Sequence, residues 1–525
     1  MIRVKQVKVS VLNDNIQELY SALVRKLKVK NSDIYDVKVL KKSIDARHKD
    51  KVSFVYDLLV DLDKCVGVRY DNDISLYEES NYSYSPSGSD VLSNRPIIVG
   101  SGPCGLFCAY ELALNGYKPI VIERGEDMDS RVHTVNEFWT SGKFNSSSNV
   151  QFGEGGAGTF SDGKLSTQIK DRNNRISEVL NIFVENGAPH EILYDFMPHI
   201  GTDKLRDVVK GIRNKIISMG GEFRYNCCLT DINVVDGRVK SIVVNGNESI
   251  SCDVLVLAIG HSARDTFRML HNRGINMCNK PFAVGVRVMH SQDMISFNQY
   301  GEYYKYLRPA SYKVTYNTSG GRGVYSFCMC PGGYVVNASS EEGRLVVNGM
   351  SNHDRESGIA NSAIVVTVNE SDYGNNLFDG VHFQERLESL AYRLGNGNIP
   401  VQLYGDYVKC VKSSSFGSIV PQFMGSTCFS DLNLLFSDDI NSSIKEAMDY
   451  FGSRIKGFNN SDVVLAGVES RTSSPIKIVR DENYLSNIFG VYPAGEGCGY
   501  AGGIVSAAVD GIKVFESISS KYKKF

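Results

Sequence analysis

Gly100-Ser101-Gly102-Pro103-Cys104-Gly105 follows a short apolar stretch, 96–99, and opens a segment whose apolar residues recur at helical spacing. The pattern is G-x-G-x-x-G, in which the first glycine permits a tight strand-to-helix turn and the second lets a pyrophosphate approach the backbone. The third glycine lets helix and strand pack closely, and the N–H groups of the first helical turn then face the phosphates. The sequence therefore predicts a Rossmann-like dinucleotide-binding unit that begins near residue 95.

An acidic residue stands where such a unit needs one. A second apolar stretch, 119–122, ends at Glu123, which lies 18 residues beyond Gly105. A carboxylate at that place can accept hydrogen bonds from the adenosine ribose hydroxyls. We predict that Glu123 and the adjacent Arg124 contact the nucleotide, while this motif by itself leaves FAD and NAD as alternatives.

A glycine-rich stretch near the end of the chain favours FAD. Residues 491–504, Val-Tyr-Pro-Ala-Gly-Glu-Gly-Cys-Gly-Tyr-Ala-Gly-Gly-Ile, predict a short strand, an acidic turn and a helix start. This element resembles the second signature of glutathione-reductase-type FAD proteins, a Gly-Asp near the C-terminus. The resemblance implies that Gly495 and Glu496 meet the ribityl or pyrophosphate region, with Glu in place of the commoner Asp. It also implies that the helix starting at Gly502, Gly503 and Ile504 points its N-terminus at the flavin.

Further blocks resemble a bacterial family of FAD-dependent dehydrogenases, within the NAD(P)/FAD-dependent oxidoreductases, that has no agreed substrate. They run from the N-terminal region to near the end, so the resemblance covers almost the whole chain. The blocks are residues 42–47, 149–165, 259–265, 327–333, 348–351 and 467–475. We expect Gly156, Ala157 and Gly158 to bring backbone close to the flavin or its diphosphate, with a plain mobile loop as the alternative. Gly260 resembles the turn that passes near FAD in related flavoproteins.

The order of predicted elements and the local composition divide the chain into four parts. Residues 1–80 show a β-α-β-β order that predicts a small α+β domain, in the ferredoxin-like form, and residues 78–94 have the Ser/Pro/Gly composition of a linker. Residues 95–270 predict the first part of the FAD-binding domain and 461–525 its C-terminal part. Between them, 271–460 is rich in short β-type segments and predicts an inserted substrate or cap domain. The fold class is therefore α/β, with a mixed β-rich insertion.

Composition excludes several classes of protein. The net charge of -2 argues against a nucleic-acid partner, and the apolar runs are too short to span a membrane. The N-terminus lacks the pattern of a secretory signal. The twelve cysteines include no Cys-x-x-Cys pair, so we expect no metal and assign most of them to reduced, buried packing in a cytoplasmic protein.

The groups that carry the reaction are harder to predict than the cofactor site. His353 and Arg355 are candidates for acid/base and anchoring roles, His261 stands at a similar level, and Arg471 could hold a carboxylate, the flavin or a structural salt bridge. Cys328 and Cys330 share one face of a predicted strand, where packing is the alternative to a thiol pair facing the flavin. No further G-x-G-x-x-G follows a strand, so any NAD(P)H would bind transiently in the cleft of the cap domain.

We therefore expect an FAD-dependent oxidoreductase that moves hydride or electrons between a small-molecule substrate and FAD. Two alternatives stay open: a flavoprotein that modifies RNA and uses the N-terminal unit as a guide, and a non-catalytic flavin sensor. The basic residues around 38–51 would serve the first alternative, but interleaved aspartates favour a solvated face. The substrate, the electron acceptor and the oligomeric state are not encoded in these patterns.

Overall fold

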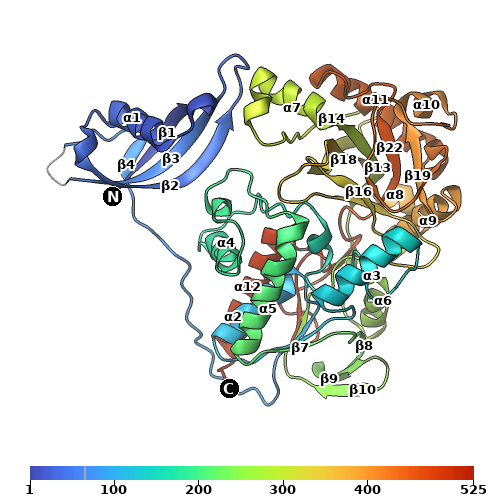
Figure 1. Cartoon of the computed structure of the whole chain (residues 1–525). Helices are drawn as coiled ribbons and strands as arrows, with labels where there is room; N and C mark the ends of the chain where they lie inside the picture. Colours follow the sequence, from blue (N-terminus) through green and yellow to red (C-terminus); the bar gives the residue numbers. More distant parts are fainter. Residues whose placement is uncertain (64–66) are drawn as a thin grey trace.

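The computed structural model describes residues 1–63 and 67–525, and its centre is a five-stranded parallel sheet in the order β24-β11-β5-β6-β7 (Figure 1). The strands are short, and all except the edge strand β7, which is Glu-Phe-Arg and partly buried, are apolar, which is typical of a parallel sheet covered on both faces. Strands that are far apart in sequence are neighbours here, because β24 comes from the C-terminal region. The strands are β5 (Ile97–Val99), β6 (Ile120–Ile122), β7 (Glu222–Arg224), β11 (Leu255–Leu257) and β24 (Val491–Pro493).

Three helices cover one face of this sheet: α2 (Pro103–Leu114), α5 (Thr202–Ser218) and α12 (Ile504–Lys521). Helix α2 is buried from Cys104 to Ala113, as expected for a helix that is apolar all round. Helix α12 packs directly on it at Gly511, where a Cβ atom would collide with the Cys104 carbonyl oxygen. This contact brings the starts of two helices, separated by four hundred residues, to the same end of the sheet.

The remaining elements of this domain surround the sheet. A hairpin turn at Asp236-Gly237, both with positive φ, joins β8 to β9 as the sequence predicts. The elements are α3 (Met128–Ser141), η3 (Ala157–Phe160), α4 (Arg175–Glu185), η4 (His190–Leu193), β8 (Leu229–Val235), β9 (Arg238–Val244), β10 (Glu248–Ser251) and α6 (Arg264–Asn272), with β12 (Met277–Asn279) paired to β23 (Ile476–Ile478).

A second domain is built on a seven-stranded sheet in the order β14-β15-β18-β13-β22-β19-β21. Its central strands are buried on both faces and are mainly apolar, with a few buried polar residues such as Arg287, His290 and Asn361. The strands are β13 (Phe282–Ser291), β14 (Thr315–Asn317), β15 (Gly323–Cys330), β18 (Ile359–Val368), β19 (Ile399–Leu403), β21 (Thr427–Phe429) and β22 (Val464–Glu469). A smaller sheet holds β16 (Tyr334–Asn337), β17 (Val347–Met350) and β20 (Phe423–Met424). The helices are α7 (Gln292–Tyr300), η5 (Gly301–Tyr306), α8 (Glu370–Tyr373), α9 (Asp379–Leu394), α10 (Tyr404–Lys409), η6 (Leu432–Leu435) and α11 (Asp438–Arg454).

The sheet of this second domain continues past the boundary predicted at residue 460. Strand β22 forms hydrogen-bonded ladders with β13 and β19, so it lies inside the sheet rather than in the FAD-binding domain. Its apolar sequence looks the same as a strand of the other domain, which is why composition misplaced it. The chain returns to the first domain after β22.

The N-terminal unit has one helix on a four-stranded antiparallel sheet, in the order β2-β3-β1-β4. Its elements are β1 (Ile2–Ser10), η1 (Val11–Asn13), α1 (Ile16–Leu27), η2 (Asn31–Asp33), β2 (Ile34–Asp45), β3 (Ser53–Leu62) and β4 (Ile74–Leu76). A ferredoxin-like β-α-β-β-α-β unit has a second helix before its last strand. The described residues between β3 and β4, which are 63 and 67–73, hold no helix, so the ferredoxin-like form stays a prediction.

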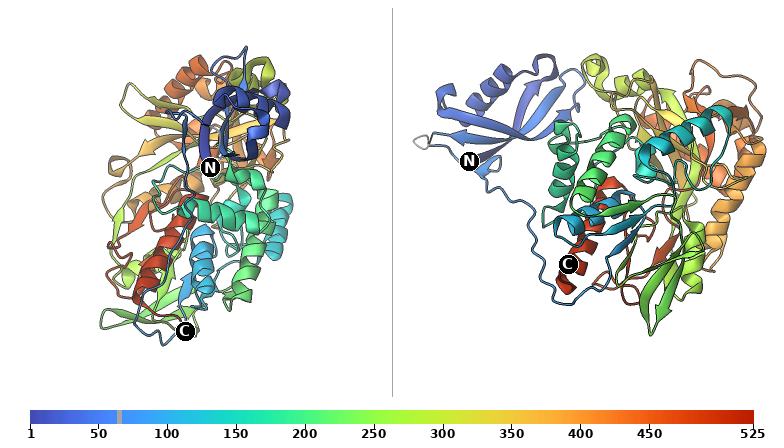
Figure 2. Two further views of the ribbon diagram at one scale, coloured as in Figure 1. Left: turned by 90° about the vertical axis from the view of Figure 1, so that its left-hand side faces the viewer. Right: turned by 60° about the horizontal axis from the view of Figure 1, so that its bottom comes forward.

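Residues 78–94 are anchored on the first domain, which the composition of a linker did not indicate. The Tyr84 hydroxyl donates to the Glu516 carbonyl oxygen at 2.7 Å, and the Gly88 N–H donates to the Ser519 carbonyl oxygen at 2.9 Å. The segment therefore follows helix α12, as both views in Figure 2 show. A second anchor joins the edge of β2 to the first domain, because the Lys42 N–H donates to the Tyr194 carbonyl oxygen at 2.7 Å.

The helices of the described part of the chain are all too short or too polar to cross a membrane.

Candidate functional site

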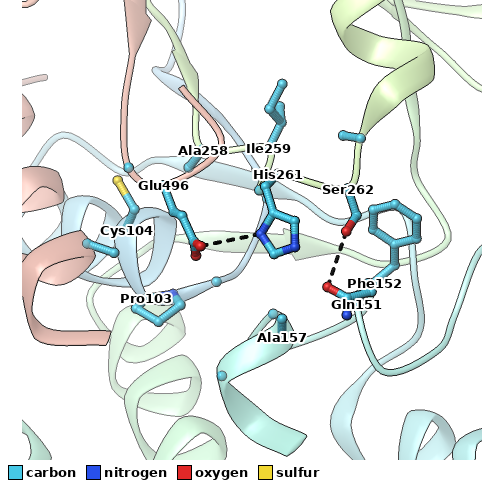
Figure 3. Close-up of a pocket in the computed structure, with 18 of the residues that line it drawn as sticks. Pro103, Cys104, Gln151, Phe152, Ala157, Ala258, Ile259, His261, Ser262 and Glu496 are labelled. Carbon is cyan, nitrogen blue, oxygen red and sulfur yellow. Dashed lines mark hydrogen bonds and ion pairs between the residues drawn. The ribbon is translucent and has the colours of Figure 1, made fainter. Parts of the chain in front are cut away.

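A cavity lies at the carboxyl end of the parallel strands, between the starts of α2 and α12 (Figure 3). Segments from many places in the sequence, between Val99 and Ala507, meet around it, as expected for a ligand site at the strand ends of an open α/β sheet. Of the residues predicted to bind the cofactor, its wall includes Gly100, Gly102, Pro103, Cys104, Glu123, Arg124, Gly156, Ala157, Gly158, Gly260, Gly495, Glu496, Gly503 and Ile504. Gly105 and Gly502 do not line it.

Both helices that face the cavity begin without a side-chain cap. The N-cap residues are Gly102 for α2 and Gly503 for α12, and neither position supplies a side-chain hydrogen bond to the first turn. The first N–H groups of a helix need a partner, and together with the helix dipole they favour an anion. Two such helix starts on one cavity suit a ligand with a pyrophosphate and a second electron-rich region.

Glycines create the space between these helix starts. Gly156 has φ +66°, and a Cβ atom there would lie 3.0 Å from the Cα of Gly102. Gly105 lies behind the residues that line the cavity, and a Cβ atom there would collide with the Gly100 carbonyl oxygen. Gly102 therefore leaves the backbone open to the ligand, and Gly105 lets the helix pack closely on the strand, as the motif requires.

Glu123 joins the nucleotide turn to the loop that follows α3. One carboxylate oxygen accepts hydrogen bonds from the Ser101 N–H at 3.0 Å and the Ser101 hydroxyl at 2.8 Å. The other oxygen accepts from the N–H groups of Gly125 and Gly153, both at 3.0 Å. A carboxylate offers about four acceptor positions, so a ribose hydroxyl would replace one of these donors. Its contact with a ribose stays a prediction.

Arg124, beside it, is held against the cavity wall. Its guanidinium donates to the Asp265 carboxylate and the Thr266 hydroxyl, both at 2.9 Å, and stacks over the Phe152 ring, 4.3 Å from its centroid. The side chain is thereby fixed in the wall of the cavity, and its contact with the nucleotide stays a prediction.

His261 and Glu496 face each other across the cavity (Figure 3). The His261 Nδ1 lies 3.4 Å from a Glu496 carboxylate oxygen, and the buried Nε2 has no hydrogen-bond partner among the described residues. A buried polar atom without a partner is costly, so this nitrogen marks a place where a ligand atom would be satisfied. Next to it, the Ser262 hydroxyl donates to the Gln151 side-chain oxygen at 3.2 Å.

Gly495 depends on an acid in helix α12 that the sequence analysis missed. The Gly495 N–H donates to Asp510 at 2.8 Å, and Asp510 also pairs with both terminal nitrogens of Arg480, at 2.7 and 2.9 Å. The acidic turn is thereby held against α12. A single aspartate on the apolar stripe of a helix was the signal that could have revealed it.

Arg471 lines the cavity, but its guanidinium forms an ion pair with the Glu388 carboxylate. Its Nε and one terminal nitrogen donate to the two carboxylate oxygens at 2.9 and 2.7 Å, and the other terminal nitrogen donates to the Ser262 hydroxyl at 3.0 Å. Burial raises the pKa of Glu388, but Arg264 and Arg471 outweigh that and hold it below its usual range. The structure therefore realises the salt bridge that the sequence left open for Arg471.

His353 and Arg355 do not reach this cavity. The His353 Nδ1 lies 2.9 Å from the Ile200 carbonyl oxygen, and its ring stacks on His199 with 5.3 Å between centroids. Arg355 donates to Asp162 at 2.8 Å. Both side chains are held by neighbouring residues outside the cofactor cavity, and their acid/base and anchoring roles stay predictions.

Cys328 lines the cavity, but the expected parity with Cys330 is broken. Cys328 has φ +45°, and the ladder between β15 and β18 shifts register between Phe327 and Cys330. A bulge inserts an extra residue and re-aims the side chains around it. The two thiols still interact: a hydrogen bond from Cys330, with Lys164 and Arg287 nearby, holds the pKa of Cys328 below its usual range, although burial opposes it.

The comparisons with known proteins place the chain in a family. The profile of the family "FAD-dependent protein, C-terminal domain-like" matches residues 281–472, and a Rossmann-like NAD(P)-binding profile matches 98–152. A domain of unknown function matches 1–61. An uncharacterised protein of Clostridium beijerinckii is 48% identical over 531 residues, covering 99% of both chains. The chain belongs to this family of FAD-dependent proteins, and FAD is its cofactor.

Solved structures with a similar chain course are flavoproteins of low sequence identity. Glycerol-3-phosphate dehydrogenase from Bacillus halodurans, solved with FAD, is 12% identical with a TM-score of 0.35; the match covers 81% of this chain and 64% of that one, so this chain spans less than two thirds of its length. Glycine oxidase from Bacillus cereus is 10% identical with a TM-score of 0.32, over 81% of this chain and 95% of that one.

The residues of the cavity fit FAD. The glycine turn and the uncapped start of α2 suit the pyrophosphate, and the uncapped start of α12 with the unpartnered His261 Nε2 offers donors to a polar ring edge. The mixed α/β fold with its Rossmann-like sheet therefore carries a cofactor site whose main contacts come from backbone.

Proposed function

We propose that the protein is an FAD-dependent dehydrogenase of the glutathione-reductase structural type, which transfers hydride or electrons between a small-molecule substrate and FAD in the cytoplasm. The observation that carries this proposal is the convergence of two uncapped helix starts, α2 and α12, on one cavity. Bound FAD would supply the electron-accepting ring. NAD(P)H would act as a transient reductant that binds in the cleft of the second domain.

The roles of the protein's own residues follow from their positions. The turn Gly100–Gly102 and the start of α2 would hold the pyrophosphate, and Glu123 would orient the ribose. The start of α12, with Gly503 and Ile504, would face the flavin end and stabilise negative charge there by about 0.3–1 kcal/mol. His261 would exchange a proton at Nε2, because its Nδ1 is held by Glu496.

The alternative of an RNA-modifying flavoprotein finds no support in the N-terminal unit. Several of its basic side chains are paired with acids: Lys8 and Arg47 with Asp45, Lys42 with Asp14, and Lys38 with Glu79. A phosphate backbone would have to replace these contacts.

Anaerobic mixing of the purified yellow protein with a panel of reductants tests the function. NADH, NADPH, 2-hydroxy acids and amino acids are each added, and loss of visible flavin absorbance is followed. We expect at least one class to reduce the flavin faster than free FAD under the same conditions. Protein that cannot be loaded with FAD, or flavin that no class reduces faster than free FAD, would contradict the proposal.

A further inference from the structure

A second cavity of about 680 Å³ adjoins the cofactor cavity in the second domain. Its size falls within the range of about 300–1,000 Å³ for small-molecule sites. Its wall is formed by the 311–315 segment, strand β15 and the end of α11, with side chains from the first domain. Cys328 lines both cavities. A molecule in the second cavity therefore has a route to the cofactor at this residue.

The charged residues that line this second cavity are all cationic: Lys164, Lys313 and Arg454. No aspartate or glutamate belongs to its lining. Lys313 and Arg454 are exposed and form no ion pair with any acid in the described ranges 1–63 and 67–525. Uncompensated cations around a concave surface raise the local concentration of anions.

Lys164 gives the strongest indication, because its amine is buried without a hydrogen bond. The Nζ atom has no hydrogen-bond partner in the part of the chain that the structure describes, and an Asp162 carboxylate oxygen lies 3.8 Å away. Asp162 is already engaged by Arg355 at 2.8 Å. An ammonium group has three donors, and burying them unsatisfied is costly. An anionic group of a ligand would satisfy them.

The remaining wall describes the rest of such a ligand. Tyr450, Phe451, Ile455 and Met329 supply apolar surface near the end of α11, while Ser326 and Thr315 are polar. The hydroxyl of Tyr312 is occupied by Ser362 at 2.7 Å. The wall thus suits a compact molecule with an apolar body and a charged end.

Cys328 is the group that such a molecule would meet at the junction. Its backbone is fixed in the left-handed region, and the Arg287 guanidinium donates to its carbonyl oxygen at 3.0 Å. Cys330 keeps its proton, since the hydrogen bond to Cys328 and burial raise its pKa. Cys328 is therefore the more reactive thiol of the pair.

We propose that this second cavity is the substrate site and that it takes a small anionic molecule, whose charged group pairs with Lys164 and Arg454 and whose other end reaches Cys328 beside the cofactor. The inference rests on the proposed function in one respect, that the bound anion is the redox substrate.

The charge selectivity of Cys328 alkylation tests the site in the FAD-loaded protein. Iodoacetate is an anion and iodoacetamide its neutral counterpart, and peptide mass spectrometry gives the labelling rate of each at Cys328 and at the exposed Cys278. We expect the iodoacetate-to-iodoacetamide ratio to be about tenfold higher at Cys328, which corresponds to about 1.4 kcal/mol, the interaction with one unit charge about 12 Å away at an effective dielectric constant of about 20. Equal ratios at the two cysteines would overturn the proposal.

Variants assign the effect to the cavity. Arg454→Gln and Lys313→Gln should each lower the Cys328 ratio severalfold, while Lys305→Gln, an exposed lysine outside both cavities, should leave it unchanged. A ratio that responds equally to all three variants would show only the general charge of the protein and would overturn the proposal. FAD content, read from visible absorbance, should stay at the wild-type level in all three.

Protection experiments separate the two sources of an anionic group. Succinate and inorganic phosphate are added separately before iodoacetamide, and slower labelling of Cys328 with one of them identifies a carboxylate or a phosphate as the recognised group. Protection by neither anion would count against the site. Because labelling is measured without turnover, a charge-selective Cys328 in protein whose flavin no reductant reduces would sink the proposed function alone.

Discussion

The two cavities that share Cys328 differ in what forms their walls, which is mainly backbone in one and side chains in the other. The cofactor cavity is made mainly of backbone: glycine turns and two uncapped helix starts, positioned by a parallel sheet. The second cavity is made of side chains from segments that lie far apart in sequence, such as Lys164 and Arg454. Backbone sites need particular residues in a fixed order, whereas side-chain sites need only a fold that brings the residues together. The first kind is therefore conspicuous in a sequence and the second is not.

Among single substitutions, one at the contact between the two domains should have the largest effect on the free energy of unfolding. Glu388 in α9 is fully buried and pairs with Arg264 from the first domain and with Arg471. Glu388→Gln removes the buried charge and leaves the partly exposed Glu341 as the remaining carboxylate partner of both guanidinium groups. We expect it to lower the free energy of unfolding by about 3 kcal/mol. Urea unfolding of the FAD-loaded protein measures this.

Glu302→Gln is the matched control, because Glu302 forms an exposed pair with Lys305 whose loss should cost about 0–1 kcal/mol. Equal midpoints for the two variants would mean that the buried pair does not hold the domains together.

Acid should weaken the second domain through His290, which lies in the core of its sheet. Burial lowers the pKa of His290 from 6.5 to about 4. Between these values the unfolded chain binds a proton that the folded protein does not, so stability falls as the pH is lowered from 6.5 towards 4. The full loss from this group is about 3 kcal/mol, at about 1.4 kcal/mol per pKa unit.

Urea midpoints across this pH range should be flatter in His290→Leu than in the wild type. The exposed His133→Asn is the control and should keep the wild-type slope. A His290→Leu protein with an unchanged slope would assign the acid sensitivity to other groups, such as His199, whose pKa burial also lowers to about 4.

The glycine turn offers a smaller but sharper test of the backbone-built site. Gly105→Ala places a methyl group against the Gly100 carbonyl oxygen. Overpacking of this kind costs about 1–3 kcal/mol, and since 1.4 kcal/mol is a factor of ten, we expect FAD to bind roughly ten- to a hundredfold more weakly. Fluorescence titration of the apoprotein with FAD measures the change.

Gly320→Ala, in an open turn where a Cβ atom meets no atom closer than 3.9 Å, should bind FAD like the wild type. Unaltered FAD binding in Gly105→Ala would show that the turn adapts and that the third glycine of the motif is dispensable here.

The sequence predicted the nucleotide turn because each glycine between Gly100 and Gly105 answers a steric demand of the strand-turn-helix unit. The C-terminal stretch was predictable for the same reason. The role of Asp510 was missed because it lies within α12, whereas its partner, the Gly495 N–H, lies in the acidic turn before that helix. His353 and Arg355 follow a family motif in sequence but lie outside the cofactor cavity, because closeness to a motif along the chain does not fix closeness to the cavity in space. The bulge at Cys328 was hidden, since no glycine marks its positive φ.

The anchoring of residues 82–90 along α12 bears on how the chain could be shortened. A chain that starts at residue 77 would keep the bonds from Tyr84 and Gly88 to α12, but it would uncover the backbone around Asp195 that β2 now pairs with. Unpaired backbone N–H and C=O groups of this kind can pair with another chain. A chain that starts at residue 95 would also uncover the side of α12 that residues 82–90 now cover, on the helix whose N-terminus lines the cofactor cavity. The N-terminal unit thus covers this backbone, and its removal would give a smaller protein that associates more readily with other molecules.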